Sequence, residues 1–213
     1  PRPPTFTLST LDSDGRVGYD TSIAVGADGL GLISYYDGTK GDLKVAHCNN
    51  AACSSATLYT LDATGDVGKW PSAAIGTDGL GLISYHGYPG ANLRVAHCSN
   101  TACSSVTSYA LDGPGNLDDA MSIAIGSDGL GLISYLDGEH GDLKVAHCGN
   151  TVCSSATYAT LDSTGVSLGA YNSIAIGTDG LPLISYLDGI REDLKVAHCS
   201  NELCIPINWG HWR

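Results

Sequence analysis

The sequence has 213 residues, of which 43% are hydrophobic, and 22 acidic residues against 10 lysines and arginines give a formal net charge of −12. The few basic residues are scattered rather than clustered, which argues against nucleic acid as a ligand because such proteins present a basic stripe. No apolar run approaches the roughly 20 residues of a membrane-spanning helix, so we expect no membrane insertion.

The first 12 residues predict an extended arm followed by a strand. Residues 1–4 are Pro-Arg-Pro-Pro, and proline cannot donate to a strand ladder. Residues 5–12 match the segments at 57–62 and 107–112, each of which ends a later unit of the chain. The chain therefore opens on a strand of the type that ends each unit. Because it begins at Pro1 without a leader-like segment, we interpret it as a mature product whose signal peptide has been removed.

The remainder of the chain consists of four copies of one unit of about fifty residues. Each copy carries a variant of Ser-Ile-Ala-Ile-Gly-x-Asp-Gly, then Leu-Ile-Ser-Tyr, then Asp-Leu-Lys-Val-Ala-His-Cys. The copies extend over residues 13–62, 63–112, 113–162 and 163–213. Repeats of this kind stack on one another as one cooperative array, so we expect a single domain over residues 1–213.

Each copy predicts four short antiparallel strands. In the first copy, residues 22–26 alternate small and branched apolar side chains, and the Asp-Gly pair that follows predicts a tight hairpin turn. The return segment, residues 30–36, is apolar on both faces, which is typical of a strand between two packed layers. Residues 43–47 and 56–61 supply the third and fourth strands. Four such strands with two apolar sides predict one blade of a β-propeller.

These repeated segments resemble the repeat of secreted bacterial β-propeller proteins, and they are loosely similar to sialidase-type propellers. The resemblance covers residues 5–204. It implies an all-β fold, a propeller of four four-stranded antiparallel blades with one surplus terminal strand, and we expect the four blades to form a ring. Propellers carry many unrelated functions, so the resemblance does not indicate an activity.

The eight cysteines form one Cys-x-x-x-x-Cys pair in each copy. The pairs are Cys48/Cys53, Cys98/Cys103, Cys148/Cys153 and Cys199/Cys204. An even count at one repeated position predicts local disulfides of about 2 kcal/mol each, and hence a secreted, extracellular protein. The absence of any Asn-x-Ser/Thr sequon favours a bacterial source. The alternative, a metal site with the preceding histidine, lacks a fourth repeated ligand, so we expect no metal and no cofactor.

The end of the chain departs from the repeat. Residues 205–213, Ile-Pro-Ile-Asn-Trp-Gly-His-Trp-Arg, stand where the other copies have their fourth strand. This tail and residues 5–12 therefore compete for the outer edge of the fourth blade. The N-terminal strand closes the ring, or the tail closes it and the N-terminal strand pairs with another molecule, or chains associate to complete a larger ring.

No catalytic constellation emerges from the residues. A sialidase needs an arginine cluster, a tyrosine nucleophile with a partner carboxylate, and an acid. The arginines instead occupy unmatched positions: Arg2, Arg16, Arg94, Arg191 and Arg213. The Ser-Tyr pairs and the histidines recur in every copy, which favours packing between blades over chemistry. The sequence therefore predicts a protein that is not an enzyme.

Two non-catalytic functions are compatible with the sequence. The first is a non-catalytic extracellular structural protein that binds other copies of itself, as a homo-oligomer or filament, through donation of its N-terminal strand or docking of its aromatic tail. The assembly candidates are Phe6, Leu8, Leu11, Trp209 and Trp212. The alternative is a lectin-like propeller that stacks a glycan on aromatic rings. Its ligand candidates are Trp70, Tyr36 and Tyr88, with Lys69-Trp70 loosely aligned to Asp20-Thr21 and Tyr171-Asn172 of other copies.

Overall fold

The computed structural model describes residues 6–88, 92–112, 121–164 and 168–205, and all regular structure in them is β-strand. The first blade contains β1 (Tyr19–Val25), β2 (Gly31–Asp37), β3 (Asp42–Cys48) and β4 (Ala56–Asp62). The second contains β5 (Asp66–Ile75), β6 (Gly81–Tyr88), β7 (Asn92–Cys98) and β8 (Val106–Ala110). The third contains β9 (Ser122–Ile125), β10 (Gly131–Asp137), β11 (Asp142–Cys148) and β12 (Ala156–Asp162). The fourth contains β13 (Leu168–Ile176), β14 (Pro182–Asp188) and β15 (Asp193–His198).

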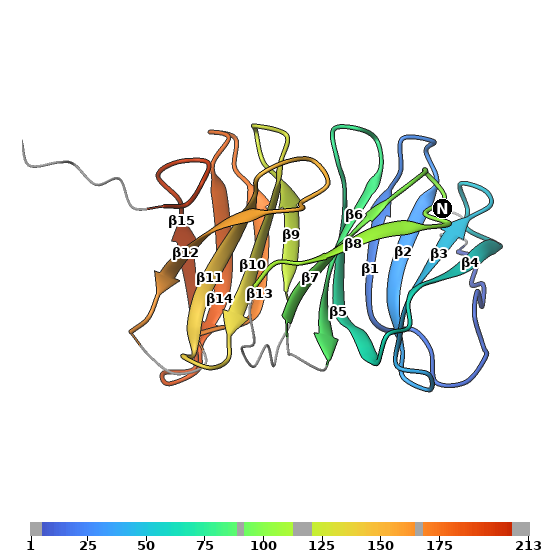
Figure 1. Cartoon of the computed structure of the whole chain (residues 1–213), viewed down its shortest axis with the longest axis horizontal. Coiled ribbons are helices and arrows are strands. Elements are labelled where there is room, and N and C mark those ends of the chain that lie inside the picture. The colour runs from blue at the N-terminus through green and yellow to red at the C-terminus, as the bar shows by residue number, and fades with distance from the viewer. Residues whose placement is uncertain (1–5, 89–91, 113–120, 165–167, 206–213) are drawn as a thin grey trace, which may run out of the picture.

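Each blade is an antiparallel meander in which strands pair in chain order. Figure 1 shows the blades side by side, with the outer strands β8 and β12 crossing in front of the inner strands. The predicted all-β fold, a propeller of four antiparallel blades, is confirmed. The fourth sheet has three described strands, and residues 206–213, which the repeat places at its outer edge, lie outside the described part of the chain.

The inner hairpin of each blade is closed by its Asp-Gly turn. In the first blade Asp28 Oδ1 accepts a hydrogen bond from the Leu30 backbone N–H at 3.0 Å, and Gly29 has a φ of +75°, a conformation that favours glycine. The other carboxylate oxygen of Asp28 lies 2.9 Å from His47 Nε2. The other repeated histidines bind the equivalent aspartates in the same way. Their side chains are 6 to 12% exposed in the first three blades and 52% exposed in the fourth, which no described blade follows, as expected for side chains that pack between blades.

Neighbouring blades bury apolar side chains against each other through one recurring pattern. We call the side of a blade that meets the next blade its back face, and the opposite side its front face. At the first junction the back face contributes Leu32, Leu43 and Val45, and the front face of the second blade contributes Ile83 and Tyr85. The next two junctions repeat this arrangement with the equivalent residues. Each junction therefore buries both faces that the sequence marked as apolar.

Each of the first three blades also places an aspartate carboxylate against a tyrosine of the next blade. Asp62, at the end of β4, accepts hydrogen bonds from Tyr85 at 2.9 Å and from Arg94 at 2.8 Å. Asp12 makes the same contacts with Tyr35 and Lys44 in the first blade, although residues 6–12 form no strand. The expected N-terminal strand is thus absent in the described residues, because no adjacent blade edge lies there for it to pair with.

The first and last blades do not meet. The inner strands pack in sequence, β1 on β5, β5 on β9 and β9 on β13, and no comparable contact joins β13 to β1 among the described residues. Figure 1 places the first blade at one end of the long axis and shows the third and fourth blades overlapping at the other. The expected ring is therefore not closed by the described part of this chain.

All four predicted disulfides are present. They join Cys48 to Cys53, Cys98 to Cys103, Cys148 to Cys153 and Cys199 to Cys204, with Cα–Cα distances of 4.8 to 4.9 Å. Each one ties the end of a third strand to the turn that follows it. Such bonds are consistent with an extracellular protein.

Candidate functional site

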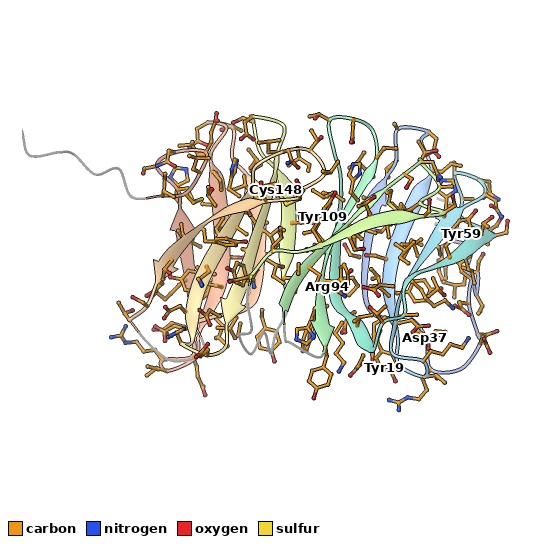
Figure 2. The ribbon with its side chains drawn as sticks, viewed as in Figure 1. Tyr19, Asp37, Tyr59, Arg94, Tyr109 and Cys148 are labelled. Carbon is orange, nitrogen blue, oxygen red and sulfur yellow. A yellow bond between two sulfur atoms is a disulfide. The ribbon has the colours of Figure 1, made fainter. Side chains whose placement is uncertain are left out.

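The two ends of the propeller differ in character. Figure 2 shows Tyr19 and Asp37 at one end of the blades and Cys148 toward the other. The disulfide end repeats closely from blade to blade. At the end that carries Tyr19 the sequences of the four copies differ, which makes this end the candidate for a site particular to one blade.

A β-bulge gives the inner strands a special position near this end. The register of β1, β5 and β13 shifts there, and one residue in each adopts a positive φ: Asp20 at 52°, Trp70 at 49° and Tyr171 at 51°. Trp70 is therefore at the position equivalent to Asp20 and Tyr171. The alignment from the sequence had matched it with the next residue in each case, Thr21 and Asn172. A bulge redirects a side chain out of the regular pleat, and in the second blade that side chain is an indole.

Trp70 is held by partners from two blades. Its ring lies edge-on to the imidazole of His86 with centroids 5.5 Å apart, and its backbone N–H donates to Asp20 Oδ2 at 3.2 Å. The side chain of Trp70 is partly exposed, whereas His86 is buried. The equivalent positions of His86 in the other blades are Tyr36, Leu136 and Leu187. The Trp-His pair is therefore particular to the second blade.

Asp66, at the start of β5, joins the first two blades through its side chain. One carboxylate oxygen accepts a hydrogen bond from the Tyr36 hydroxyl at 2.5 Å, and the other accepts one from Lys69 at 2.6 Å. Burial alone would raise the pKa of Asp66, but these two donors lower it below its usual value. Burial and the Asp66 carboxylate raise the pKa of Tyr36 to about 12. At neutral pH the junction thus presents an ionised carboxylate beside a protonated phenol.

A second carboxyl group, in the first blade, has its pKa displaced in the opposite direction. Asp42, 8% exposed, has its pKa raised, first by burial and then by the nearby charge of Asp37. The turn before it packs on the start of β5, where the Val67 N–H donates to the carbonyl of Gly41 at 2.9 Å. Asp42 pairs with Asp37 in the β2–β3 register and lies on the face of β3 opposite Leu43 and Val45, which meet the second blade. Asp42 therefore does not form an acid–base pair with Asp66.

The structure brings the three predicted ligand candidates to one region. Tyr36 binds Asp66 directly, Tyr88 is paired with Asp66 in the β5–β6 register and is 58% exposed, and Trp70 is four residues along β5. Sequence reasoning missed Asp66, Lys69, His86 and Asp20. The signal available for His86 was the replacement of Tyr36-Asp37 by His86-Gly87 in the second copy.

The assembly candidates lie elsewhere. Phe6 and Leu8 are 81% and 86% exposed, and Leu11 lines a cavity on the front face of the first blade. Trp209 and Trp212 lie outside the described residues. In the described ranges no three His, Cys, Asp or Glu side chains are grouped as metal ligands, and no helix is long and apolar enough to cross a membrane.

Comparison with known proteins gives structural relatives only. No protein-family model matches the chain, and no curated protein matches its sequence. An α-L-arabinofuranosidase from Lactobacillus brevis superimposes with a TM-score of 0.57 at 9% identity, covering 85% of this chain and 67% of the enzyme. A GH43 β-xylosidase/α-arabinofuranosidase from a compost metagenome gives 0.52 at 15%, covering 85% and 69%. An exo-β-1,3-galactanase from Phanerochaete chrysosporium gives 0.59 at 11%, covering 89% of this chain and 48% of the enzyme.

These relatives correct two predictions. The structures that share the fold are glycoside hydrolases, which overturns the prediction of a non-catalytic fibre or scaffold subunit and the prediction that the chain is not an enzyme. The resemblance to sialidase-type propellers is not confirmed by them. At these identities the likeness establishes the fold, and the chain spans only about half of the galactanase.

Proposed function

We propose that this protein acts on carbohydrate, and that the glycan binds at the junction of the first two blades. The observation that carries the proposal is the Trp70 cluster, which we define as Trp70, His86, Tyr36, Asp66 and Lys69. It replaces the repeated pattern at one junction with an indole, an imidazole and a charged pair. Repeated positions serve packing that all blades share, whereas a position that departs from the repeat is free to serve a ligand.

The chemistry of the cluster suits a sugar. A partly exposed indole offers an apolar face for the C–H groups of a sugar ring, and its fixed edge contact with His86 holds that face in place. Asp66 and Lys69 supply an acceptor and donors for hydroxyl groups, and hydrogen bonds to charged groups are the stronger ones. Tyr88, exposed at the end of β6, extends the aromatic surface.

The reaction that the junction supports is hydrolysis of a glycosidic bond. That reaction uses two carboxyl groups, one protonated and one ionised, on either side of the scissile bond. Asp66, which Lys69 and Tyr36 keep ionised by lowering its pKa, is the candidate for the base or nucleophile at this junction. The names of the structural relatives suggest arabino-, xylo- and galacto-oligosaccharides as substrates to test first.

The test is a titration with xylotriose and with β-1,3-galactotriose, followed by tryptophan fluorescence and by chromatography of the products. We expect saturable binding that the variant Trp70→Ala weakens at least tenfold. Tyr171→Ala is the matched control, because Tyr171 sits at the same bulge with the same backbone conformation and is 74% exposed. We expect hydrolysis to be lost in Asp66→Asn. Binding that Trp70→Ala and Tyr171→Ala affect equally contradicts the proposed site.

The setting that fits this function is extracellular. We propose secretion by a bacterium, supported by the four local disulfides and by the lack of N-glycosylation sequons. Protein collected with a thiol-blocking reagent from the source culture is expected in the medium with no blocked cysteine. Recovery of the protein inside cells with alkylated cysteines contradicts this location.

A further inference from the structure

Two apolar faces of the propeller have no neighbour among the residues that the structure describes. On the back face of the fourth blade, Leu194 and Val196 are 80% and 57% exposed, whereas their equivalents Leu43 and Val45 are 0% exposed. On the front face of the first blade, Ile23 is 64% exposed, whereas the equivalent isoleucines of the third and fourth blades are 7% exposed. The array therefore ends in one bare back face and one bare front face.

The bare front face is hollow where a back face fits. A cavity of about 400 Å³ lies there, and its lining includes Val17, Ile23, Ile33, Tyr35 and Ala46. The equivalents of Ile33, Tyr35 and Ala46 in the second blade are Ile83, Tyr85 and Ala96, which pack on leucines and a valine of the blade before. The cavity is thus the seat for side chains of the type that the fourth blade leaves exposed.

Two glycines of the first blade also have open space where their equivalents in the second blade contact the preceding blade. A Cβ on Gly68 would lie 2.5 Å from the Leu43 Cα of the preceding blade, while one on Gly18, at the equivalent position of the first blade, meets nothing within 4 Å. In the Asp-Gly turns, a Cβ on Gly79 would lie 3.2 Å from the Ala27 Cβ, and one on Gly29 again meets nothing within 4 Å. The space before the first blade is therefore of the kind that a blade of this same repeat occupies at the other junctions.

The N-terminal segment already stands in the place of an outer strand. Asp12 binds Tyr35 and Lys44 as Asp62 binds Tyr85 and Arg94, so Asp12 occupies the place of the last residue of a preceding blade's fourth strand. The fourth sheet has no described strand beyond β15. By the register of β3 and β4, in which Leu43 pairs with Asp62 and Ala46 with Leu58, β15 would pair Leu194 with Asp12 and Ala197 with Leu8.

We propose that the fourth blade of a second copy of this chain docks on the front face of the first blade, with residues 6–12 completing its sheet. Among the described residues the first and fourth blades of one chain make no contact comparable to those at the other junctions, so a second copy is the occupant that the arrangement favours. The contact is head-to-tail, and such contacts give a ring when the rotation closes. Two arcs of four blades reach the upper end of the range of about four to eight blades found in propellers.

Cysteine pairs across the junctions test this contact. Between the first three pairs of blades, a Cβ at Gly79, Gly129 or Gly180 lies 3.2 to 3.7 Å from the Cβ of the preceding turn, close to the separation in a disulfide. At the proposed contact between two copies, the equivalent positions are Thr178 of one copy and Gly29 of the other. Both positions are exposed. The control is Ala27→Cys with Gly79→Cys, which closes within one chain and shows that a cysteine at the turn glycine is tolerated.

We expect a mixture of the Gly29→Cys and Thr178→Cys variants to form a two-chain product with oxidised glutathione, and light scattering of the unmodified protein to give the mass of two copies. Val196→Asp, on the exposed face, is expected to reduce that mass to one copy without loss of β-sheet circular dichroism. A monomeric protein whose variants do not cross-link while the control closes overturns the proposal. So does cross-linking of the double variant Gly29→Cys/Thr178→Cys within one chain, which would mean that the ring closes on itself.

Discussion

Asp12 accepts a hydrogen bond from the ammonium of Lys44 at 2.6 Å, although Asp12 belongs to no strand. The carboxylate also accepts one from Tyr35 at 2.7 Å, and both the Asp12 and Lys44 side chains are only 9% exposed. The pairing repeats what Asp62 and Asp162 do at the next junctions. The segment before the first blade is therefore fixed by the same polar contact that joins one blade to the next.

Replacing Asp12 by Asn should make the protein less stable in a pH-dependent way. Burial raises the pKa of Asp12, but hydrogen bonds from Lys44, the backbone of Asp14 and Tyr35 lower it to about 2 from 3.8. A lowered pKa stabilises the fold above pH 3.8, and the contribution is lost as the pH falls toward 2. We expect Asp12→Asn to cost about 2 kcal/mol at pH 7 and less at pH 3, as measured by urea unfolding. An equal cost at both pH values would contradict the ionic origin.

Two glycines at equivalent positions should respond differently to alanine. Gly68 and Gly18 have φ values of +92° and +83°, so both substitutions carry a similar backbone strain of about 1–2 kcal/mol. Only Gly68→Ala also forces a Cβ against the backbone of Leu43, which adds about 1–3 kcal/mol. The measurement is the difference in unfolding free energy between the variants, made at a protein concentration low enough to keep the chain monomeric. Equal losses would show that the tight contact with Leu43 is not there.

Removing one disulfide should weaken the blade that carries it. Cys98 and Cys103 are fully buried and enclose a short loop, for which loop closure predicts about 2 kcal/mol. We expect the double variant Cys98→Ser/Cys103→Ser to lower the free energy of unfolding by about that amount. Thermal unfolding with and without reducing agent checks it, because the reductant should affect the variant less than the parent protein. A variant as stable as the parent protein would mean that this disulfide does not contribute to the free energy of unfolding.

The pH dependence of glycan binding should report on Lys69. Hydrogen bonds from Lys69 and Tyr36 oppose the effect of burial and lower the pKa of Asp66, which keeps the carboxylate ionised in mild acid. We expect Lys69→Met to move the acidic limb of the binding profile to higher pH. Arg191→Met is the control, because Arg191 pairs with Asp188 in the fourth blade and its side chain is 72% exposed. A shift of the same size in both variants would indicate a general charge effect.

The repeat made the architecture predictable. A period of about fifty residues, strands with two apolar faces and one cysteine pair per copy determine the blades, their stacking and the four disulfides. Closure was not predictable, because the repeat describes contacts between neighbouring copies and is silent on whether the last copy reaches the first. Ile23 and Leu194 are of the same residue types as the buried residues at equivalent positions of other blades. Only their exposure in the structure shows that the described chain leaves them uncovered.

The candidate site was predictable only in part. Trp70, Tyr36 and Tyr88 stand out in the sequence as aromatic residues on one pair of blades, yet nothing in their spacing shows that they meet around Asp66. That meeting depends on the bulge at Trp70, which shifts the register of β5 against β6. The lowered pKa of Asp66 depends on Tyr36 from the first blade and Lys69 from the second, which no local pattern encodes.

The most direct test is a crystal structure of the protein soaked with xylotriose, the ligand recorded with one of the structural relatives. We expect electron density for a sugar ring stacked on the indole of Trp70, with a hydroxyl group bound to the carboxylate of Asp66. A sugar bound at another junction, or a junction of the first two blades left without sugar at saturating concentration, would contradict the proposed carbohydrate site.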